Sequence, residues 1–426
     1  MSFNLLRNSR VFFTTAVGTS GAALGVIGGS GAPGLTATNT REIQVLDGFG
    51  FSQNTTSETV TLSETGQTPV RGQRSFNTQL DPVDFNMTTY IRPAKDGTAI
   101  TAEESVLWNA LFGVVAANTT NSAWTDGTAA VAANPTATPP VAAAAAVAAV
   151  CNADSSNVHQ LQRFGLIVII DTACFFIDDC VLNTATLDFG IDAIASIQWA
   201  GQAKAIRQVA GPTTIGNGTF AGSGVFSSTA FKPKTTTAAF IANKLSVITL
   251  QKNLNGTATS TDNSYYNVPL TGGNLTISNN VSYLTPATLG IVNQPVTYFT
   301  GTRAVSGSLT AYLRTGAGQN GSTNNVSTTP ATSDAKTTAQ LLSDLLTAST
   351  TDVDPAYRMS IAIGGTSATD RVELEMPGVV LTIPTIATEQ VISTTINFTA
   401  QGTSGTGSST GFDLAGTNEL KVRYYA

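Results

Sequence analysis

The sequence predicts a mainly β chain with short helices, an α+β fold built as two tandem β-sandwich domains, each with one flanking helix. Three observations predict this fold. Long stretches alternate apolar or β-branched residues with polar ones, as half-buried antiparallel strands do. Two short blocks carry apolar residues at helical spacing. Three different blocks also occur twice in the same order, which predicts an internal duplication.

The longest repeated block is VLNTATLDFGIDAIASIQWAGQ, residues 181–202. Moved forward by 199 positions, it aligns without a gap with VLTIPTIATEQVISTTINFTAQ, residues 380–401. The identical residues are Val181 and Val380, Leu182 and Leu381, Thr186 and Thr385, Ile197 and Ile396, and Gln202 and Gln401. Both copies read as a pair of strands.

Two further blocks repeat in the same order. FNMTTYIRP (85–93) aligns with GSLTAYLRT (307–315), so that a Tyr-(Ile/Leu)-Arg motif occurs in each copy. The helix-like block EESVLWNALF (103–112) corresponds to TAQLLSDLLT (338–347). Each copy is therefore expected to contain strands, a short helix and a closing strand pair.

The first copy can be followed element by element. Residues 9–16 predict a first strand, and the glycine-rich residues 18–34 predict a loop or flexible arm. Residues 41–62 alternate as half-buried antiparallel strands do, and 265–284 are their expected counterpart.

A long hairpin loop and a helix are expected next. Glycines and a proline in residues 66–80 favour the loop, with Arg71 and Arg74 near its tip. Residues 102–113 predict a helix that covers one side of a sheet. The very apolar run 164–170 predicts a buried strand.

The expected organisation has five parts and two insertions. It comprises an N-terminal strand and flexible arm (1–40), a first domain (41–210) with a low-complexity insertion (114–157), a linker (211–243), a second domain (244–401) with an insertion (316–337), and a C-terminal arm (402–426). The strand-like end of that arm, 418–426, could pair with its own sheet or with a neighbouring subunit, and the neighbour is slightly favoured.

Composition favours an assembly subunit. Charged residues make up 11% of the chain, against about 25% in average proteins, and small polar residues replace them. Such a surface suits extensive protein–protein contacts. The net charge of −6 and the lack of a Lys/Arg run argue against tight binding to nucleic acid. The three cysteines, Cys151, Cys174 and Cys180, lack motif spacing and predict reduced thiols in a protein made in a cytosol.

No pattern predicts catalysis, a cofactor or a metal site. His159 is the single histidine and has no acid or cysteine pattern beside it. The acidic clusters at 81–84, 178–179 and 352–354 do not fit EF-hand spacing, and 25–34 lacks the Lys-Ser/Thr of a phosphate-binding loop. The sequence therefore predicts a non-enzymatic protein without cofactors. No window approaches the roughly 20 apolar residues of a membrane span, and no continuous signal-peptide core forms at the N-terminus.

The pattern resembles the tail tube proteins of long-tailed bacteriophages. The residues that carry the resemblance are the strands and loop of 41–76, FNMTTYIRP, the helix block EESVLWNALF, and MPGVVLTIPTIATEQVISTTINFTAQG at 376–402. Tube proteins have a small β-sandwich core with one flanking helix, a long hairpin loop and terminal arms, and they assemble into stacked hexameric rings. Some of them resemble a fused pair of tube domains.

The resemblance implies two tandem tail-tube-like β-sandwich domains that close into a ring-shaped β-barrel on oligomerisation. Three chains would form a pseudo-hexameric ring, and stacked rings would form the channel for DNA ejection. Acidic side chains on the wall would repel phosphate. The channel-lining candidates are Asp178, Asp179, Asp188, Asp192, Glu373, Glu375 and Glu389. Arg71 and Arg74 are the candidates for contacts between rings.

The implied partners are further copies of the chain, tape measure, tail terminator and baseplate or tip proteins, and a sheath if the tail is contractile. DNA would pass through without specific binding, and no membrane is involved. The expected location is the virion tail, after assembly in the cytoplasm of the host bacterium. The alternatives are another virion structural protein, such as a sheath, capsid or decoration protein, and a secreted β-rich adhesin or carbohydrate-binding module.

Overall fold

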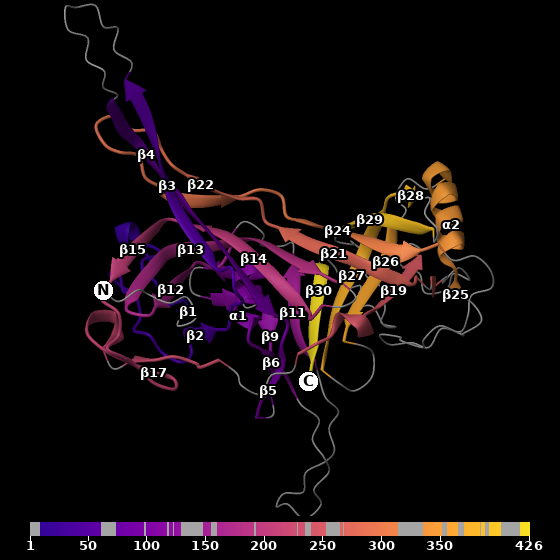
Figure 1. Ribbon diagram of the computed structural model, residues 1–426, viewed down its shortest axis with the longest axis horizontal. Helices are drawn as coiled ribbons and strands as arrows, with labels where there is room; N and C mark the ends of the chain where they lie inside the picture. The colour runs from indigo at the N-terminus through magenta and orange to yellow at the C-terminus, as the bar shows by residue number, and fades with distance from the viewer. Residues whose placement is uncertain are drawn as a thin grey trace, which may run out of the picture.

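The fold is mainly β, with large antiparallel sheets, and this confirms the predicted fold class (Figure 1). The computed structural model describes residues 9–60, 74–97, 99–116, 119–121, 123–128, 148–154, 160–190, 193–227, 229–234, 240–252, 265–266, 268–313, 335–351, 356–364, 370–383, 385–387, 392–401 and 418–426. Two α-helices occur within these residues, α1 (Ser105–Phe112) and α2 (Thr338–Thr351).

The strands fall into two lobes that lie side by side in Figure 1. The first lobe contains β1 (Ser9–Thr14), β2 (Thr40–Ile43), β3 (Gly50–Val60), β4 (Arg74–Tyr90), β5 (Pro93–Asp96), β6 (Ala99–Ala102), β7 (Val114–Ala116), β8 (Thr119–Asn121), β9 (Trp124–Thr125), β10 (Gly127–Thr128), β11 (Ala149–Asp154), β12 (Phe164–Ile170), β13 (Ala173–Asp188), β14 (Ser196–Ala203), β15 (Ala205–Val209), β16 (Thr214–Ile215), β17 (Thr219–Ala221) and β18 (Thr229–Ala230). The second contains β19 (Val247–Lys252), β20 (Tyr265–Tyr266), β21 (Leu270–Ser278), β24 (Ala304–Tyr312), β25 (Ala335–Lys336), β26 (Ala356–Ile363), β27 (Arg371–Leu381), β28 (Thr385–Ala387) and β29 (Ser393–Gln401). Between β21 and β24 the chain forms the hairpin of β22 (Val281–Leu284) and β23 (Thr297–Thr300), which packs on the first lobe, where the hydroxyl of Tyr283 donates to the carbonyl of Asp179. The last strand, β30 (Asn418–Tyr425), lies between the lobes.

One antiparallel sheet runs through both lobes. Its order is β3, β4, β14, β13, β21, β24, β29 and β28, with each strand hydrogen-bonded to the next. We call these eight strands the shared sheet. The lobes meet where β13 pairs with β21, and we call this pairing the seam. The backbone ladder is therefore continuous from one lobe to the other.

The same strand pairing occurs twice in the shared sheet. Tyr90 of β4 pairs with Ser196 of β14, and Tyr312 of β24 pairs with Ser393 of β29. Tyr90 and Tyr312 also correspond in the repeated sequence block, so Ser196 corresponds to Ser393. This correspondence lies two residues from the ungapped alignment, which had paired Ile197 with Ile396. A two-residue slip keeps every side chain on its face of the sheet, so alternation alone could not detect it.

A ring and a glycine face each other in both copies, with the roles exchanged. Phe85 lies opposite Gly201 in the first lobe, and Gly307 lies opposite Phe398 in the second. A Cβ atom added to Gly201 would lie 2.5 Å from Cζ of Phe85, and one added to Gly307 would lie 2.6 Å from Cζ of Phe398. Each glycine therefore leaves the space that the ring on the neighbouring strand occupies.

Each lobe is a sandwich in which one long strand takes part in both sheets. The beginning of β13 pairs with β12 and β15, and its end pairs with β14 and β21. The beginning of β27 pairs with β26 and β30, and its end pairs with β29. The apolar run 164–170 forms the buried strand β12, as predicted.

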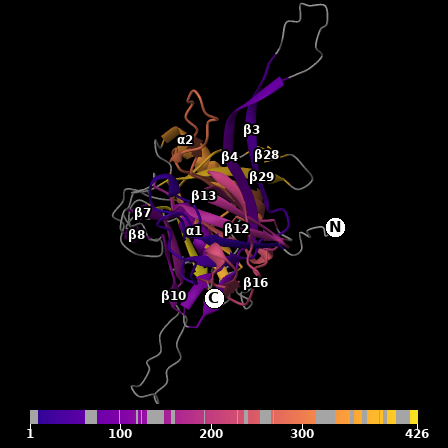
Figure 2. The ribbon, with the colours of Figure 1, turned by 90° about the vertical axis from the view of Figure 1, so that its left-hand side faces the viewer.

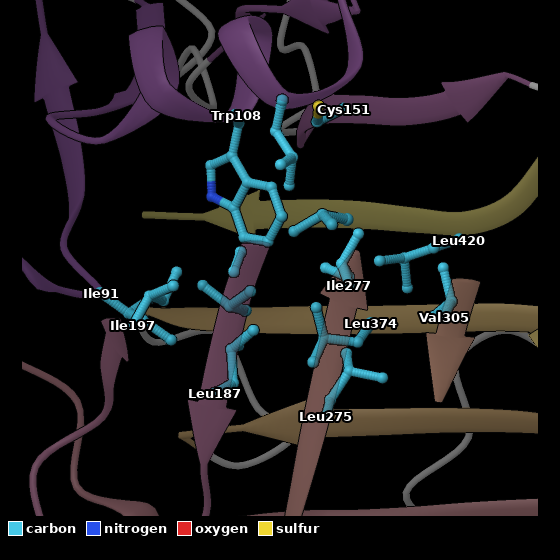
Figure 3. Packing of buried hydrophobic residues seen from close by; sticks show 14 of the residues in the cluster. Ile91, Trp108, Cys151, Leu187, Ile197, Leu275, Ile277, Val305, Leu374 and Leu420 are labelled. Carbon is cyan, nitrogen blue, oxygen red and sulfur yellow. The ribbon is translucent and has the colours of Figure 1, made fainter. Parts of the chain in front are cut away.

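A single hydrophobic core extends across the seam. Figure 3 shows Leu187, Leu275 and Ile277 packed with Leu374 and Val305, and all of them belong to one buried cluster. Because residues from both lobes share this core, the seam is stabilised by apolar burial as well as by backbone hydrogen bonds.

Helix α1 supplies the centre of that core in the first lobe. Its Trp108 lies edge-on to Trp199 of β14, with ring centroids 5.1 Å apart. The helix begins at Ser105, later than the predicted 102–113, because Ala99–Ala102 form β6. Of the residues predicted as a long hairpin loop, 66–80, residues 74–80 belong to β4, and residues 66–73 lie outside the described residues.

The C-terminal strand β30 pairs within its own chain. It lies between β27 of the second lobe and β11 of the first. Inside the first lobe, the indole Nε1 of Trp108 donates a hydrogen bond of 2.7 Å to the hydroxyl of Tyr424. The preference for a neighbouring subunit was therefore wrong. The two strands with which β30 pairs, β27 and β11, belong to the same chain as β30.

The described residues of the segment expected as a linker, 211–243, include a part that packs against the first lobe. It contains the small sheet of β16, β17 and β18. Phe220 and Phe231 contact Phe12 of β1, with ring centroids 4.9 and 5.0 Å away. Most of the two insertions, His159 and the residues from 402 to 417 lie outside the described residues.

Glu104 generates a pH prediction. It is buried in front of α1, where the backbone N–H of Arg92 donates to its Oε1 atom (3.1 Å). Burial raises the pKa of this carboxyl from 4.5 to about 7. The folded chain then binds a proton at Glu104 that the unfolded chain releases between these pH values, so the contribution of Glu104 to stability is fully present below pH 4.5 and is lost as the pH rises through 7. The difference of about 2.5 pKa units corresponds to about 3 kcal/mol.

The test compares the chain with its Glu104→Gln variant, which cannot titrate at this position. We expect the free energy of unfolding of the native chain, relative to the variant, to fall by about 3 kcal/mol between pH 4.5 and pH 7. Urea unfolding of the unassembled protein at a series of pH values measures this difference. Glu58→Gln, at an exposed position, is the control. Parallel pH profiles for Glu104→Gln and the native chain would contradict the prediction.

Candidate functional site

One face of the shared sheet packs against the hydrophobic core, and the other face does not. Along β14, Ile197 and Trp199 are buried, whereas Gln198 between them is exposed. The same alternation holds in β13, β21, β24 and β29, because side chains of a strand point alternately to the two faces. We call the side away from the core the open face.

Hydroxyl and amide side chains cover most of the open face. They are Asn86, Thr88, Thr184, Thr186, Ser196, Gln198, Gln202, Asn274, Thr276, Ser278, Ser306, Ser308, Thr310, Ser393, Thr395, Asn397 and Thr399. Several of them bond across strands: Ser308 Oγ donates to Asn274 Oδ1 (3.3 Å), and Gln202 Nε2 donates to Asp84 Oδ1 (3.2 Å). The face is therefore hydrophilic without depending on charge.

The charge that this face does carry is negative. Asp84 on β4 and Asp188 at the end of β13 are exposed on it. Among the open-face positions whose side chains the structure describes on β4, β13, β14, β21, β24 and β29, there is no lysine or arginine. Lysine and arginine side chains that neutralise phosphates supply most of the non-specific affinity of proteins for DNA. The open face thus has the chemistry of a surface that stays hydrated and does not hold a polyanion.

Of the predicted channel-lining residues, Asp188 is the one that the structure describes on the open face. Four others lie inside the molecule: Asp178, Asp179, Glu373 and Glu375 are each at most 3% exposed. Asp192, Glu389 and the loop residue Arg71 lie outside the described residues, and Arg74 is placed only as the first residue of β4.

Asp179 lies where β13 passes from one sheet to the other. Its φ of 57° is in the left-handed region, which aspartate tolerates better than most side chains. Both carboxylate oxygens accept hydrogen bonds of 2.8 Å from Arg163, and the backbone N–H donates to the carbonyl of Gly25 (2.8 Å). Burial raises the pKa of this carboxyl, while the arginine opposes the shift.

Asp178 fixes the N-terminal arm to the same corner. Its Oδ1 atom accepts a hydrogen bond of 2.8 Å from the backbone N–H of Ile27, and Arg207 forms an ion pair with the carboxylate. Arg207 also donates to the carbonyl of Ile27 (3.1 Å). The glycine-rich arm predicted at 18–34 is thus held by side chains of β13 and β15.

Glu373 and Glu375 form a comparable pair in the second lobe. Arg371 lies 3.0 Å from Glu373, and Arg423 of β30 lies 2.7 Å from Glu375. The hydroxyl of Tyr425 also donates to Oε2 of Glu373 (3.0 Å), so both glutamates connect β27 with the C-terminal strand. The sequence shows that these four residues are acidic, but it does not show that each carboxylate is buried beside an arginine.

Sequence reasoning missed the hydroxyl and amide residues that dominate the open face. A signal for them was present, because the strand STTINFTAQ (393–401) places Thr395, Asn397 and Thr399 at alternate positions between apolar residues. These residues carry no charge, so a prediction of the channel wall that relies on charge does not include them.

No metal or membrane feature appears in the part of the chain that the structure describes. There, no group of three or more His, Cys, Asp or Glu side chains could hold a metal ion. Neither described helix is long and apolar enough to cross a membrane.

No family model matches this chain. It is similar to the tail tube protein pb6 of Escherichia phage T5, with 27% identity over 415 residues. The similarity covers 94% of this chain and 73% of the relative. It confirms the resemblance to phage tail tube proteins predicted from the sequence, and it supports a structural role rather than an enzymatic one.

The corner at Asp179 generates a stability prediction. Replacing Arg163 with methionine leaves a fully buried carboxylate without its cation, and we expect this to lower the free energy of unfolding by about 3–5 kcal/mol. The double variant Arg163→Met/Asp179→Asn removes the charge as well, and asparagine also tolerates the left-handed conformation. It should recover part of the loss. Urea unfolding measures both, and additive losses in the double variant would show that the two side chains are not coupled.

Proposed function

We propose that this chain is a structural subunit of a bacteriophage tail tube. Three copies form a pseudo-hexameric ring, and stacked rings enclose the channel through which DNA leaves the virion. The observation that carries this proposal is the shared sheet, which has two edges, a polar open face and a core side common to both lobes. The similarity to a tail tube protein supports the same assignment.

Ring formation fits the way the shared sheet ends. Its outer strands are β3 and β28, and in the described residues each pairs on one side, with β4 and β29 respectively. A sheet edge is a template for a further strand. Two different edges on one chain favour head-to-tail contacts, which close into a ring when the rotation permits. Three chains of two lobes each then give six similar units.

The open face is the proposed wall of the channel. Its hydroxyl and amide groups hold water, and the exposed carboxylates of Asp84 and Asp188 repel phosphate. DNA that moves past the described part of the open face meets no lysine or arginine side chain on β4, β13, β14, β21, β24 or β29. The arrangement therefore favours the passage of DNA over the binding of DNA, and a few charged residues are enough for this.

The hairpin of β3 and β4 is proposed to reach an adjacent ring. Figure 2 shows these two strands extending beyond the rest of the molecule. Arg71 and Arg74, predicted for this loop, are the candidates for contacts there. At the ends of the tube, tape measure, tail terminator and baseplate or tip proteins are the proposed partners, with a sheath outside if the tail contracts. As a tube subunit, the protein is a component of the virion tail that is assembled in the host cytoplasm.

The ring can be tested directly by negative-stain electron microscopy of the purified protein. We expect rings or tubes with a central hole and six lobes when seen end-on, at a mass of three chains per ring. Six lobes are expected because the two halves of each chain share one strand order. Monomers or closed shells at high protein concentration would instead favour a capsid or decoration protein.

The wall can be tested by adding cations to it. The double variant Gln198→Lys/Asn397→Lys changes two exposed positions of the open face, away from the core. We expect it to assemble normally and to bind double-stranded DNA at low salt, with affinity that falls steeply as salt rises, because binding releases counterions. Native tubes should not bind.

The matched control is Gln208→Lys, at an exposed position on β15, which is not part of the shared sheet. Filter binding of labelled DNA to assembled tubes measures all three proteins. Equal DNA binding by the control and the double variant would contradict the assignment of the open face to the channel.

A further inference from the structure

The seam is a pairing of two strands, β13 and β21, whose counterparts in the repeat can be identified from the strand register. Three residue pairs define its end: Thr186 with Thr276, Leu187 with Leu275, and Asp188 with Asn274. The hydroxyl oxygens of Thr186 and Thr276 lie 3.4 Å apart on the open face. Leu187 and Leu275 are buried on the core side. The seam therefore joins a hydroxyl pair on one face to an apolar pair on the other.

The β13 side of the seam has its counterpart in β28. Thr186 pairs with Gln198 of β14, and Thr385 pairs with Thr395 of β29. Because Ser196 corresponds to Ser393, Gln198 corresponds to Thr395. Thr385 is therefore the counterpart of Thr186, which agrees with the repeated sequence. β28 thus corresponds to the end of β13, but it lies at an edge of the shared sheet, whereas β13 lies inside the sheet.

The β21 side of the seam has its counterpart in β3. Asn86 of β4 pairs with Gly50, and Ser308 of β24 pairs with Asn274. Since Tyr90 corresponds to Tyr312, Asn86 corresponds to Ser308. Gly50 is therefore the counterpart of Asn274, and β3 repeats β21 at the opposite edge of the shared sheet.

We propose that β28 of one chain pairs antiparallel with β3 of the next chain, in the register of the seam. The occupant of each edge is thus a second copy of this chain. The proposed pairs are Thr385 with Ser52, Ile386 with Phe51, and Ala387 with Gly50 of the neighbour. This interface rests on the proposed function, since it requires a ring, and it adds which strands meet and in which register.

The side-chain types at the proposed pairs match those of the seam. Thr385 and Ser52 repeat the hydroxyl pair, and Ile386 and Phe51 repeat the apolar pair. Phe51 is half-buried in the single chain, on the side where its ring lies 5.6 Å from that of Phe175. Ser52 is exposed, as expected for a position on the open face. A shift of one residue would exchange the two faces and place an apolar side chain opposite a hydroxyl.

The consequence for the ring is that its six junctions are of one kind. Three are seams within chains, and three are the proposed pairings between chains, so the twist at each junction is alike. A seam that is already formed in the folded monomer therefore sets the angle at which the next copy is added. Closure after three copies follows if that angle is one sixth of a turn per lobe.

Disulfide trapping tests the register. In the variant Ser52→Cys/Thr385→Cys, oxidation of assembled rings should shift the chain from monomer to covalent trimer on a non-reducing gel, because directly opposed side chains are close enough for a disulfide. The native cysteines, Cys151, Cys174 and Cys180, are buried and should not take part. Reduction should return the monomer.

Two matched variants complete the design. Thr186→Cys/Thr276→Cys places the same pair in the seam and should form a disulfide within one chain, which shows that oxidation works in this sheet. Ser52→Cys/Ala387→Cys keeps both thiols on the open face but moves one by two residues, beyond the reach of a disulfide. It should stay monomeric on the gel.

The outcomes separate the register from the ring. Covalent trimers from the registered pair, and not from the shifted one, support the interface. Rings seen by microscopy together with no trimer, or with equal trimer from the shifted pair, overturn the register and leave the tube assignment standing. Native protein that forms no ring at all overturns the interface along with the proposed function.

Discussion

The pairing of β13 is the constraint on which the rest of the structure depends. This strand forms ladders with β12, β14, β15 and β21, so it belongs to both sheets of the first lobe and also joins the second lobe. To serve both sheets it must bend, and the bend requires a left-handed residue, Asp179, whose carboxylate is neutralised by Arg163. The buried ion pairs are thus part of the geometry that makes a continuous sheet possible.

Much of the fold could be predicted from the sequence because strands that alternate leave a periodic signal. The strand pair that begins at Val181, the buried β12 and the repeated Tyr-(Ile/Leu)-Arg motif were found in this way. Two features left no such signal. A slip of two residues between β14 and β29 preserves alternation. The path of β30 depends on contacts such as that of Tyr424 with Trp108, 316 residues apart, and no local pattern encodes a contact at that distance.

The candidate site was predicted less well, since the prediction relied on charge. It selected acidic residues near the repeated strands, and of these the structure describes Asp188 as exposed on the open face. Asp178 and Glu373 have the same sequence character but lie inside the lobes beside arginines. Burial depends on tertiary packing and not on residue type, so the two groups could not be separated. Thr395 and Asn397 carry no charge, so a prediction based on charge did not select them. They matter for the open face because many such polar side chains line up along its strands.

The position of β30 also has a consequence for how the chain folds during synthesis. This strand fills the space between β11 and β27, and its Tyr424 bonds to Trp108 in the core of the first lobe. The ribosome must therefore add several hundred residues after α1 before the first lobe can acquire its last core strand. Contacts so distant along the chain close slowly, and until then β11 has a vacant edge. The two lobes should thus reach their native state together rather than in order of translation.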